Sequence, residues 1–135
     1  MEMSRRGWFA SCALAMGLSG CTAVNPAPEL DADAAGTIAP GELLKNPGDQ
    51  VKVHLPGGSE AVLVWRSAQG YGAASIVCPH RGSEVHYNAA AGRLDCPSHG
   101  SQFAPDGRVV RGPATRPLTA YRVEVEGDRL SLRRG

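Results

Sequence analysis

The chain has 135 residues, of which 14 are Lys or Arg and 13 are Asp or Glu, so its formal net charge is +1. This near-neutral balance gives no sign of a nucleic-acid partner. The length suffices for one domain with a modest core and leaves no room for a second, catalytic domain.

Residues 1–20 have the parts of a bacterial export signal. Arg5 and Arg6 come first, an apolar stretch runs from Trp8 to Leu18, and small residues follow. The apolar stretch is shorter than the roughly twenty residues that a membrane-spanning helix needs. We therefore expect residues 1–20 to be a signal peptide that is removed on export.

Two resemblances refine this signal. Residues 18–21, Leu-Ser-Gly-Cys, resemble a lipobox, which implies cleavage before Cys21 and a diacylglycerol on its sulfur. Residues 4–9 resemble the twin-arginine export motif, whose route carries folded proteins. Together they imply a protein anchored by lipid on the periplasmic side of a bacterial membrane. The alternative is an ordinary secretory signal in which Cys21 is a chance cysteine.

The rest of the chain predicts a short tether and one all-β domain. Residues 21–36 lack periodic apolar positions and are interpreted as a flexible tether, and residues 37–135 as the domain. Strand-like segments occur at 50–55, 60–65, 71–77, 84–87, 93–94, 109–110, 121–126 and 129–132. One helical turn is expected at 42–45. Many short strands separated by turn signals are typical of sandwiches and barrels. The residues expected in the core are Val62, Val64, Trp65, Ile76, Leu118, Val123, Val125 and Leu130.

Two short runs carry the chemistry. They are Cys78-Pro79-His80-Arg81-Gly82 and Cys96-Pro97-Ser98-His99-Gly100, which together read C-x-H-x15-C-x2-H. Zinc can also take two Cys and two His, but its sites usually pair Cys with Cys and His with His along the chain. Here each run mixes the two types. This favours a two-iron, two-sulfide cluster with one iron on Cys78 and Cys96 and the other on His80 and His99.

These runs resemble those of Rieske iron–sulfur proteins, and the resemblance extends from about Thr37 to the C-terminus. It implies antiparallel sheets with an inserted cluster-binding subdomain, in which the cysteines hold a buried iron and the histidines an exposed one. Gly112-Pro113-Ala114 resembles the family's proline loop, which covers the cluster. Histidine ligation places the potential at roughly −150 to +300 mV, against about −400 mV for plant-type ferredoxins.

Four positions refine the expected potential and stability. Ser83 and Ser98 stand where high-potential members of the family carry a disulfide between the loops, and we interpret both as turn residues whose hydroxyls bond nearby backbone. Ser101 matches a serine that donates to a sulfide in the family, whereas Phe103 replaces a tyrosine that donates to a cysteine sulfur. The resemblance therefore implies an intermediate potential.

The predicted function is one-electron transfer by a membrane-tethered periplasmic carrier or electron-transfer subunit, without catalysis of its own. The expected partner is a cytochrome, a quinol-linked complex or the large subunit of an oxidoreductase. Alternatives are the ferredoxin component of a Rieske oxygenase system and a zinc-binding structural lipoprotein. His54 and His86 lie outside the runs and are expected to be surface or strand residues rather than ligands.

Overall fold

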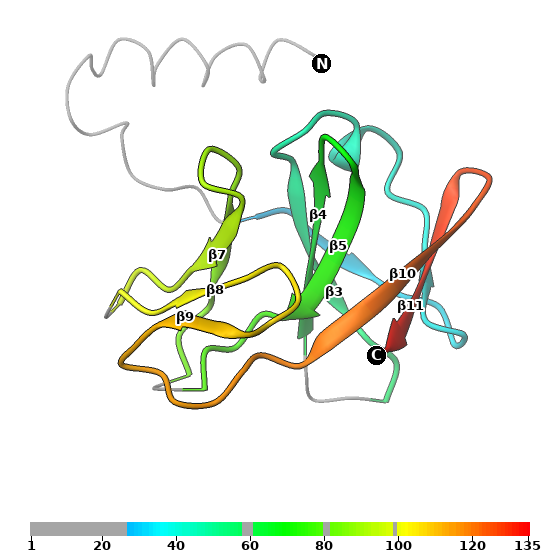
Figure 1. Cartoon of the computed structure of the whole chain (residues 1–135). Coiled ribbons are helices and arrows are strands. Elements are labelled where there is room, and N and C mark those ends of the chain that lie inside the picture. Colours follow the sequence, from blue (N-terminus) through cyan, green and yellow to red (C-terminus); the bar gives the residue numbers. More distant parts are fainter. Residues whose placement is uncertain (1–26, 58–60, 80–81, 99) are drawn as a thin grey trace, which may run out of the picture.

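The computed structural model describes residues 27–57, 61–79, 82–98 and 100–135, and most of these residues lie in or beside β-strands (Figure 1). The one short helix among them, the 3-10 turn Gly41–Leu44, matches the expected helical turn. None of the helical structure in these ranges is long and apolar enough to cross a membrane. The all-β prediction is confirmed.

The larger sheet of the described residues has seven strands in the order β1-β3-β4-β5-β10-β11-β2. Their bounds are β1 Glu29–Asp31, β2 Thr37–Ile38, β3 Gln50–His54, β4 Ala61–Ser67, β5 Gly70–Ser75, β10 Ala120–Glu126 and β11 Arg129–Arg134. All neighbours are antiparallel except β1 and β3. Strands β3 and β4 correspond to the expected strand-like segments 50–55 and 60–65, and they pair with each other.

The smaller sheet has four strands within the described residues, in the order β6-β7-β8-β9. Their bounds are β6 His86–Asn88, β7 Arg93–Asp95, β8 Gln102–Phe103 and β9 Val109–Arg111. The chain leaves the larger sheet after β5 and returns to it in β10, which pairs directly with β5. Figure 1 shows the smaller sheet beside the larger one. The inserted subdomain expected from the sequence is therefore present.

Strand β4 is buried on both faces, which explains its unbroken apolar run. Val62 and Val64 point into one core with strands β3 and β11. Ala61, Leu63 and Trp65 point into a second core shared with the smaller sheet. Alternate side chains of a strand face opposite ways, so a strand between two cores needs apolar residues at every position. Full burial of each Val or Leu stabilises the fold by about 1.5–3 kcal/mol.

The two sheets are joined by specific contacts around Tyr87 of β6. The side-chain amide of Gln50 donates to the carbonyl oxygen of Tyr87 at 3.1 Å and accepts from its N–H at 2.8 Å. The rings of Trp65 and Tyr87 stack with centroids 5.3 Å apart. Gly72 lies opposite Trp65, and a Cβ there would collide with the indole ring. These contacts fix the inserted subdomain on the larger sheet.

Two expectations differ from the structure. The segment interpreted as a tether, 21–36, contributes strand β1, whose backbone pairs with β3 in parallel. Only Leu30 of β1 packs against the core, so the edge strand shows no apolar periodicity. Val125 was expected in the core but is 59% exposed, because it lies near the tip of the β10–β11 hairpin, beyond the core. Val123, on the same strand, is only partly buried.

Candidate metal centre

The first cysteine loop, residues 78–83, joins the end of β5 to β6. The N–H of Cys78 donates to the carbonyl oxygen of Ser83 at 2.7 Å, and the N–H of Gly82 donates to the carbonyl oxygen of Cys78 at 2.8 Å. Gly82 has a φ of +81°, a backbone conformation that other residues rarely adopt. The hydrogen bonds and the glycine together fix a tight loop behind Cys78.

The second cysteine loop, residues 96–101, joins β7 to β8 and has the same backbone arrangement. Here Cys96 donates to the carbonyl oxygen of Ser101 at 2.8 Å, and Gly100, with a φ of +82°, donates to that of Cys96 at 3.1 Å. Both loops have the sequence Cys-Pro-x-x-Gly-Ser, and the proline and glycine at the same positions explain the same backbone conformation. The two cysteines therefore occupy equivalent positions in two equivalent loops.

Both cysteines lie in the core between the sheets. Cys78 is 1% exposed and Cys96 is 3% exposed, and the same core holds Leu63 and Phe103. Within the part of the chain that the structure describes, neither cysteine forms a disulfide. A thiolate in such apolar surroundings needs a cation to compensate its charge. The pair is therefore suited to a metal-containing group that neutralises both sulfurs.

Ser101 lies next to Cys96, whose N–H donates to its carbonyl oxygen, and it carries a buried hydroxyl. Its side chain is fully buried, and its Oγ accepts a hydrogen bond of 3.1 Å from the N–H of Ala114 in the proline loop. The described residues provide no acceptor for the proton of this hydroxyl. A bound sulfide would supply one. The donor set of two buried thiols and one buried hydroxyl thus fits a [2Fe–2S] cluster, which supplies a one-electron couple when bound.

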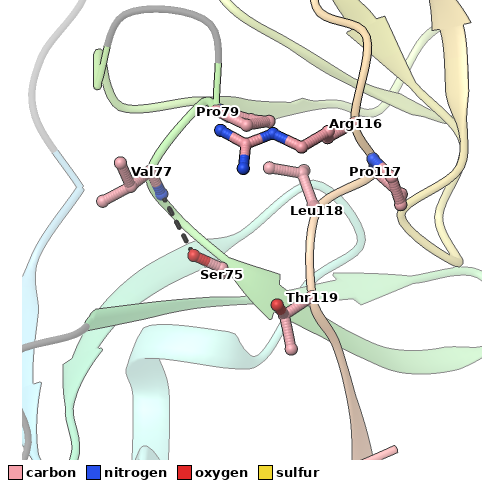
Figure 2. Close-up of a pocket in the computed structure, with 7 residues that line it drawn as sticks. All are labelled: Ser75, Val77, Pro79, Arg116, Pro117, Leu118 and Thr119. Atoms are coloured by element: carbon pink, nitrogen blue, oxygen red, sulfur yellow. Dashed lines mark hydrogen bonds between the residues drawn. The ribbon is translucent and has the colours of Figure 1, made fainter.

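The segment after the proline loop, residues 116–119, borders the first cysteine loop. A shallow pocket of about 220 Å³ lies between Val77 and Pro79 on one side and residues 116–119 on the other. Figure 2 shows the guanidinium of Arg116 extending toward Pro79, and both residues line this pocket. Residues 116–119 are also hydrogen-bonded to Gly107, whose carbonyl oxygen accepts from the N–H of Leu118 at 2.8 Å. This hydrogen bond fixes the position of Leu118 beside the pocket.

The serines that replace the family's disulfide cysteines contact each other. The Oγ atoms of Ser83 and Ser98 lie 2.6 Å apart, one from each cysteine loop. Our interpretation of them as turn residues bonded to nearby backbone differs from this, because the two loops approach closely enough for a hydroxyl pair. Sequence spacing could not reveal this approach. A hydrogen bond thus joins the loops where the resemblance would place a covalent bond.

We expect this hydroxyl pair to slow loss of the cluster. Ser83→Ala or Ser98→Ala removes the bond, whose net contribution is about 0.5–1.5 kcal/mol, so the rate of cluster loss to a chelator should rise roughly two- to tenfold. The double variant should be no faster than the faster single variant, since both changes remove one interaction. Absorbance bleaching measures these rates.

A serine that bonds only within its own turn provides the control. The hydroxyl of Ser67 donates to the carbonyl oxygen of Gly70 at 3.2 Å, so Ser67→Ala should leave the bleaching rate unchanged. Additive effects of the Ser83 and Ser98 changes would contradict a coupled pair.

Charges next to the cysteine loops are locally compensated. Asp95 directly precedes Cys96; burial raises its pKa, but hydrogen bonds from Asn88 and Arg93 outweigh this and hold the pKa below its usual range. On the other loop, Glu84 forms an ion pair with Lys52 of β3. Neither carboxylate therefore leaves an unbalanced negative charge beside a cysteine.

Of the predicted site residues, the structure places Cys78 and Cys96 in one core between the sheets, and it joins Ser101 to Cys96 by a backbone hydrogen bond. The predicted ligands His80 and His99 lie outside the described residues, as do residues 1–20 and Cys21. These remain predictions.

The two histidines outside the motif lie on strands, as expected. His54 is on β3, with its Nε2 2.8 Å from a carboxylate oxygen of Glu29, and His86 is on β6.

Sequence reasoning missed several supporting groups. The amide of Gln50 and the N–H of Ala114 act through contacts between segments distant along the chain, and no local pattern signals them. Gly107 did leave a signal, because it ends a Pro-Asp-Gly turn. Its role against Leu118 could not be read from that turn.

The chain is similar in sequence and fold to known proteins. It is 39% identical over 89 residues to the cytochrome b6-f complex iron–sulfur subunit of Synechococcus elongatus. The aligned region covers 64% of this chain and half of that subunit's length. The plasma membrane Rieske protein of Synechocystis PCC 6803 is 32% identical, with a TM-score of 0.52 over 62% of this chain and 85% of that one. The ferredoxin of carbazole 1,9a-dioxygenase from Nocardioides aromaticivorans is 26% identical, with a TM-score of 0.59 over 68% and 89%.

The family itself is assigned by a match over most of the folded part. Residues 37–122 match the family described as the Rieske [2Fe-2S] domain, and this range contains both cysteine loops and the proline loop. The match implies a [2Fe–2S] cofactor and confirms that prediction over zinc. The chain is thus a member of the Rieske [2Fe-2S] domain family.

Proposed function

We propose that this protein is a one-electron carrier or the electron-transfer subunit of a redox complex, without catalysis of its own. The observation that carries the proposal is the pair of buried cysteines on two equivalent, hydrogen-bonded loops. Loops fixed in this way keep the iron–ligand distances nearly constant between the oxidised and reduced states. This lowers the reorganisation energy of electron transfer. Relatives with similar sequences are named as subunits of the cytochrome b6-f complex, which supports a partner of that kind.

The ligand assignment is part of the proposal. Cys78 and Cys96 would hold one iron of the cluster, and His80 and His99 would hold the other. The bound cluster would supply a one-electron couple, and the His80 and His99 imidazoles would couple proton uptake to reduction.

Voltammetry of the protein adsorbed on an electrode tests this function. A reversible one-electron wave is expected, at a potential between those of ferredoxin-like and quinol-oxidising members of the family. Ser101→Ala should lower the potential, because the serine hydroxyl favours the reduced state. A hydrogen bond to a charged group contributes about 1.5 kcal/mol or more, which corresponds to a shift of roughly 60 mV for one electron. Phe103→Tyr should raise the potential.

Ser131 provides the matched control, since it is a buried serine on β11 of the larger sheet. Ser131→Ala should leave the potential unchanged. Absence of any reversible wave in the wild type would contradict electron transfer. An unchanged potential in Ser101→Ala would contradict only the tuning role.

We also propose that the protein is exported and anchored by lipid at Cys21, on the periplasmic side of a bacterial membrane. The support is the export signal and lipobox-like run in the sequence. In a bacterial host, the wild type should take up labelled palmitate and fractionate with membranes, whereas Cys21→Ala should not be labelled. Cys12→Ala is the control, because Cys12 would leave with the signal peptide. A Cys21→Ala protein that is still labelled contradicts the anchor.

A second candidate function is that of the ferredoxin component of an oxygenase system. The structural similarity to the carbazole dioxygenase ferredoxin, over 89% of that chain, favours it. Such a component would work in the cytoplasm, so the fractionation experiment discriminates between the two functions.

A further inference from the structure

The carboxylates of the inserted subdomain are all matched by cations. Between residues 76 and 119, the described carboxylates are Glu84, Asp95 and Asp106. Glu84 pairs with Lys52 of the larger sheet, and the other two pair with Arg93 and Arg108 of the subdomain. The negative charge of this region is therefore already compensated.

Within the described part of the inserted subdomain, two guanidiniums have no carboxylate partner, and they bracket the proline loop. Arg111 ends β9 and lies opposite Gln102, the residue that follows the second cysteine loop. Arg116 extends toward Pro79 of the first cysteine loop, and the two residues line one pocket (Figure 2). Both arginines are exposed. Each cysteine loop thus has one unpaired positive charge at its side.

Apolar surface accompanies these charges. Val77, which directly precedes Cys78, is 41% exposed and lines the pocket that Arg116 borders. Val110, next to Arg111, is 56% exposed. Exposed apolar side chains with cations around them are typical of protein docking sites, in which an apolar centre is surrounded by a charged rim.

We propose that Val77, Val110, Arg111 and Arg116, here called the cationic patch, form the docking surface for an acidic redox protein. The proposal rests on the electron-transfer function proposed above and names the chemistry of the partner. Two charges on opposite sides of a loop, with apolar side chains beside them, match a protein surface better than a single small anion. A partner docked here contacts Val77 and Pro79, the neighbours of Cys78, so the path to the redox centre is short.

Cytochrome c in two charge forms provides the probe. The native protein is basic, and the form with succinylated lysines is acidic. Reduced protein is mixed with either ferric form in a stopped-flow instrument. One electron leaves the reduced protein and converts one ferric haem to ferrous haem, with no other reactant. At low ionic strength the wild type should reduce the acidic form about tenfold faster than the basic form, and salt should remove the difference.

Charge reversal at the two arginines tests whether the cationic patch causes this difference in reduction rate. Arg111→Glu with Arg116→Glu should slow reduction of the acidic form about tenfold and speed reduction of the basic form. A change in the redox potential alone would move both rates in the same direction. The control, Arg122→Glu with Arg129→Glu on the β10–β11 hairpin, changes the net charge equally and should stay within about twofold of the wild type.

The outcomes separate this proposal from the function on which it rests. If the patch variant and the hairpin control behave alike, the docking surface is wrong and electron transfer stands. If wild-type protein that contains iron reduces neither cytochrome, the electron-transfer function fails, and the docking proposal fails with it. Visible absorbance of each variant verifies that the centre is intact.

Discussion

Replacing Cys96 with alanine is expected to remove the iron–sulfur chromophore while leaving the larger sheet folded. Cys96 is 3% exposed in the core between the sheets, and no other described thiol could take its place. The larger sheet has its own core, built around Val51, Val62 and Leu130, which does not include Cys96. Iron analysis should therefore give less than about a tenth of the wild-type content, and far-UV circular dichroism should remain strand-like.

A change two residues further along the same loop provides the comparison. Ser98→Ala disturbs the loop but removes no predicted ligand, so the purified protein should retain its iron. Full iron content in Cys96→Ala would contradict the assignment of Cys96 as a ligand. Equal loss of iron in both variants would show that loop integrity, rather than the thiol, decides cluster content.

The largest expected effect on stability comes from Gly107→Ala. Gly107 is buried with a φ of +93°, and a Cβ there would collide with the carbonyl oxygen of Leu118. Strain at such a backbone position costs about 1–3 kcal/mol, and relief of the collision requires the Leu118 backbone to move. We expect the free energy of unfolding in urea to fall by roughly 3 kcal/mol or more.

Gly127→Ala separates the two contributions. Gly127 also has a positive φ, of +65°, but nothing lies within 4 Å of a Cβ at that position. Its replacement should cost about 1–2 kcal/mol, the penalty for a left-handed backbone alone. Equal losses in the two variants would contradict the claim that the close approach of Gly107 to Leu118 adds to the cost of the substitution.

The cysteine loops could be predicted from the sequence because their chemistry is local. A cysteine, a proline and a glycine within five residues fix the loop, and the ligand types select the cofactor. The strands around residues 50–65 were equally predictable, since turn residues separate two apolar runs. Among the described strands, β3 to β7 and β9 to β11 therefore followed from short-range signals.

The remaining features depend on contacts between distant segments. The pair of Ser83 and Ser98 forms only because the fold brings two loops together. The two hydrogen bonds between the Gln50 side chain and the Tyr87 backbone join residues 37 positions apart. Strand β1 was missed because an edge strand is held by backbone pairing and needs few apolar side chains. The prediction that Val125 lies in the core was wrong because the alternation of apolar residues along β10 continues past the end of the core.

The central claim is that two cysteines and two histidines hold a [2Fe–2S] cluster in this protein. Electron paramagnetic resonance of the dithionite-reduced protein tests it most directly, with pulsed detection of nitrogen couplings. We predict a rhombic spin-½ signal with couplings from two directly bound imidazole nitrogens, lost in His80→Ala and His99→Ala. A colourless protein containing zinc, or a reduced cluster without coupled ligand nitrogens, would contradict the account.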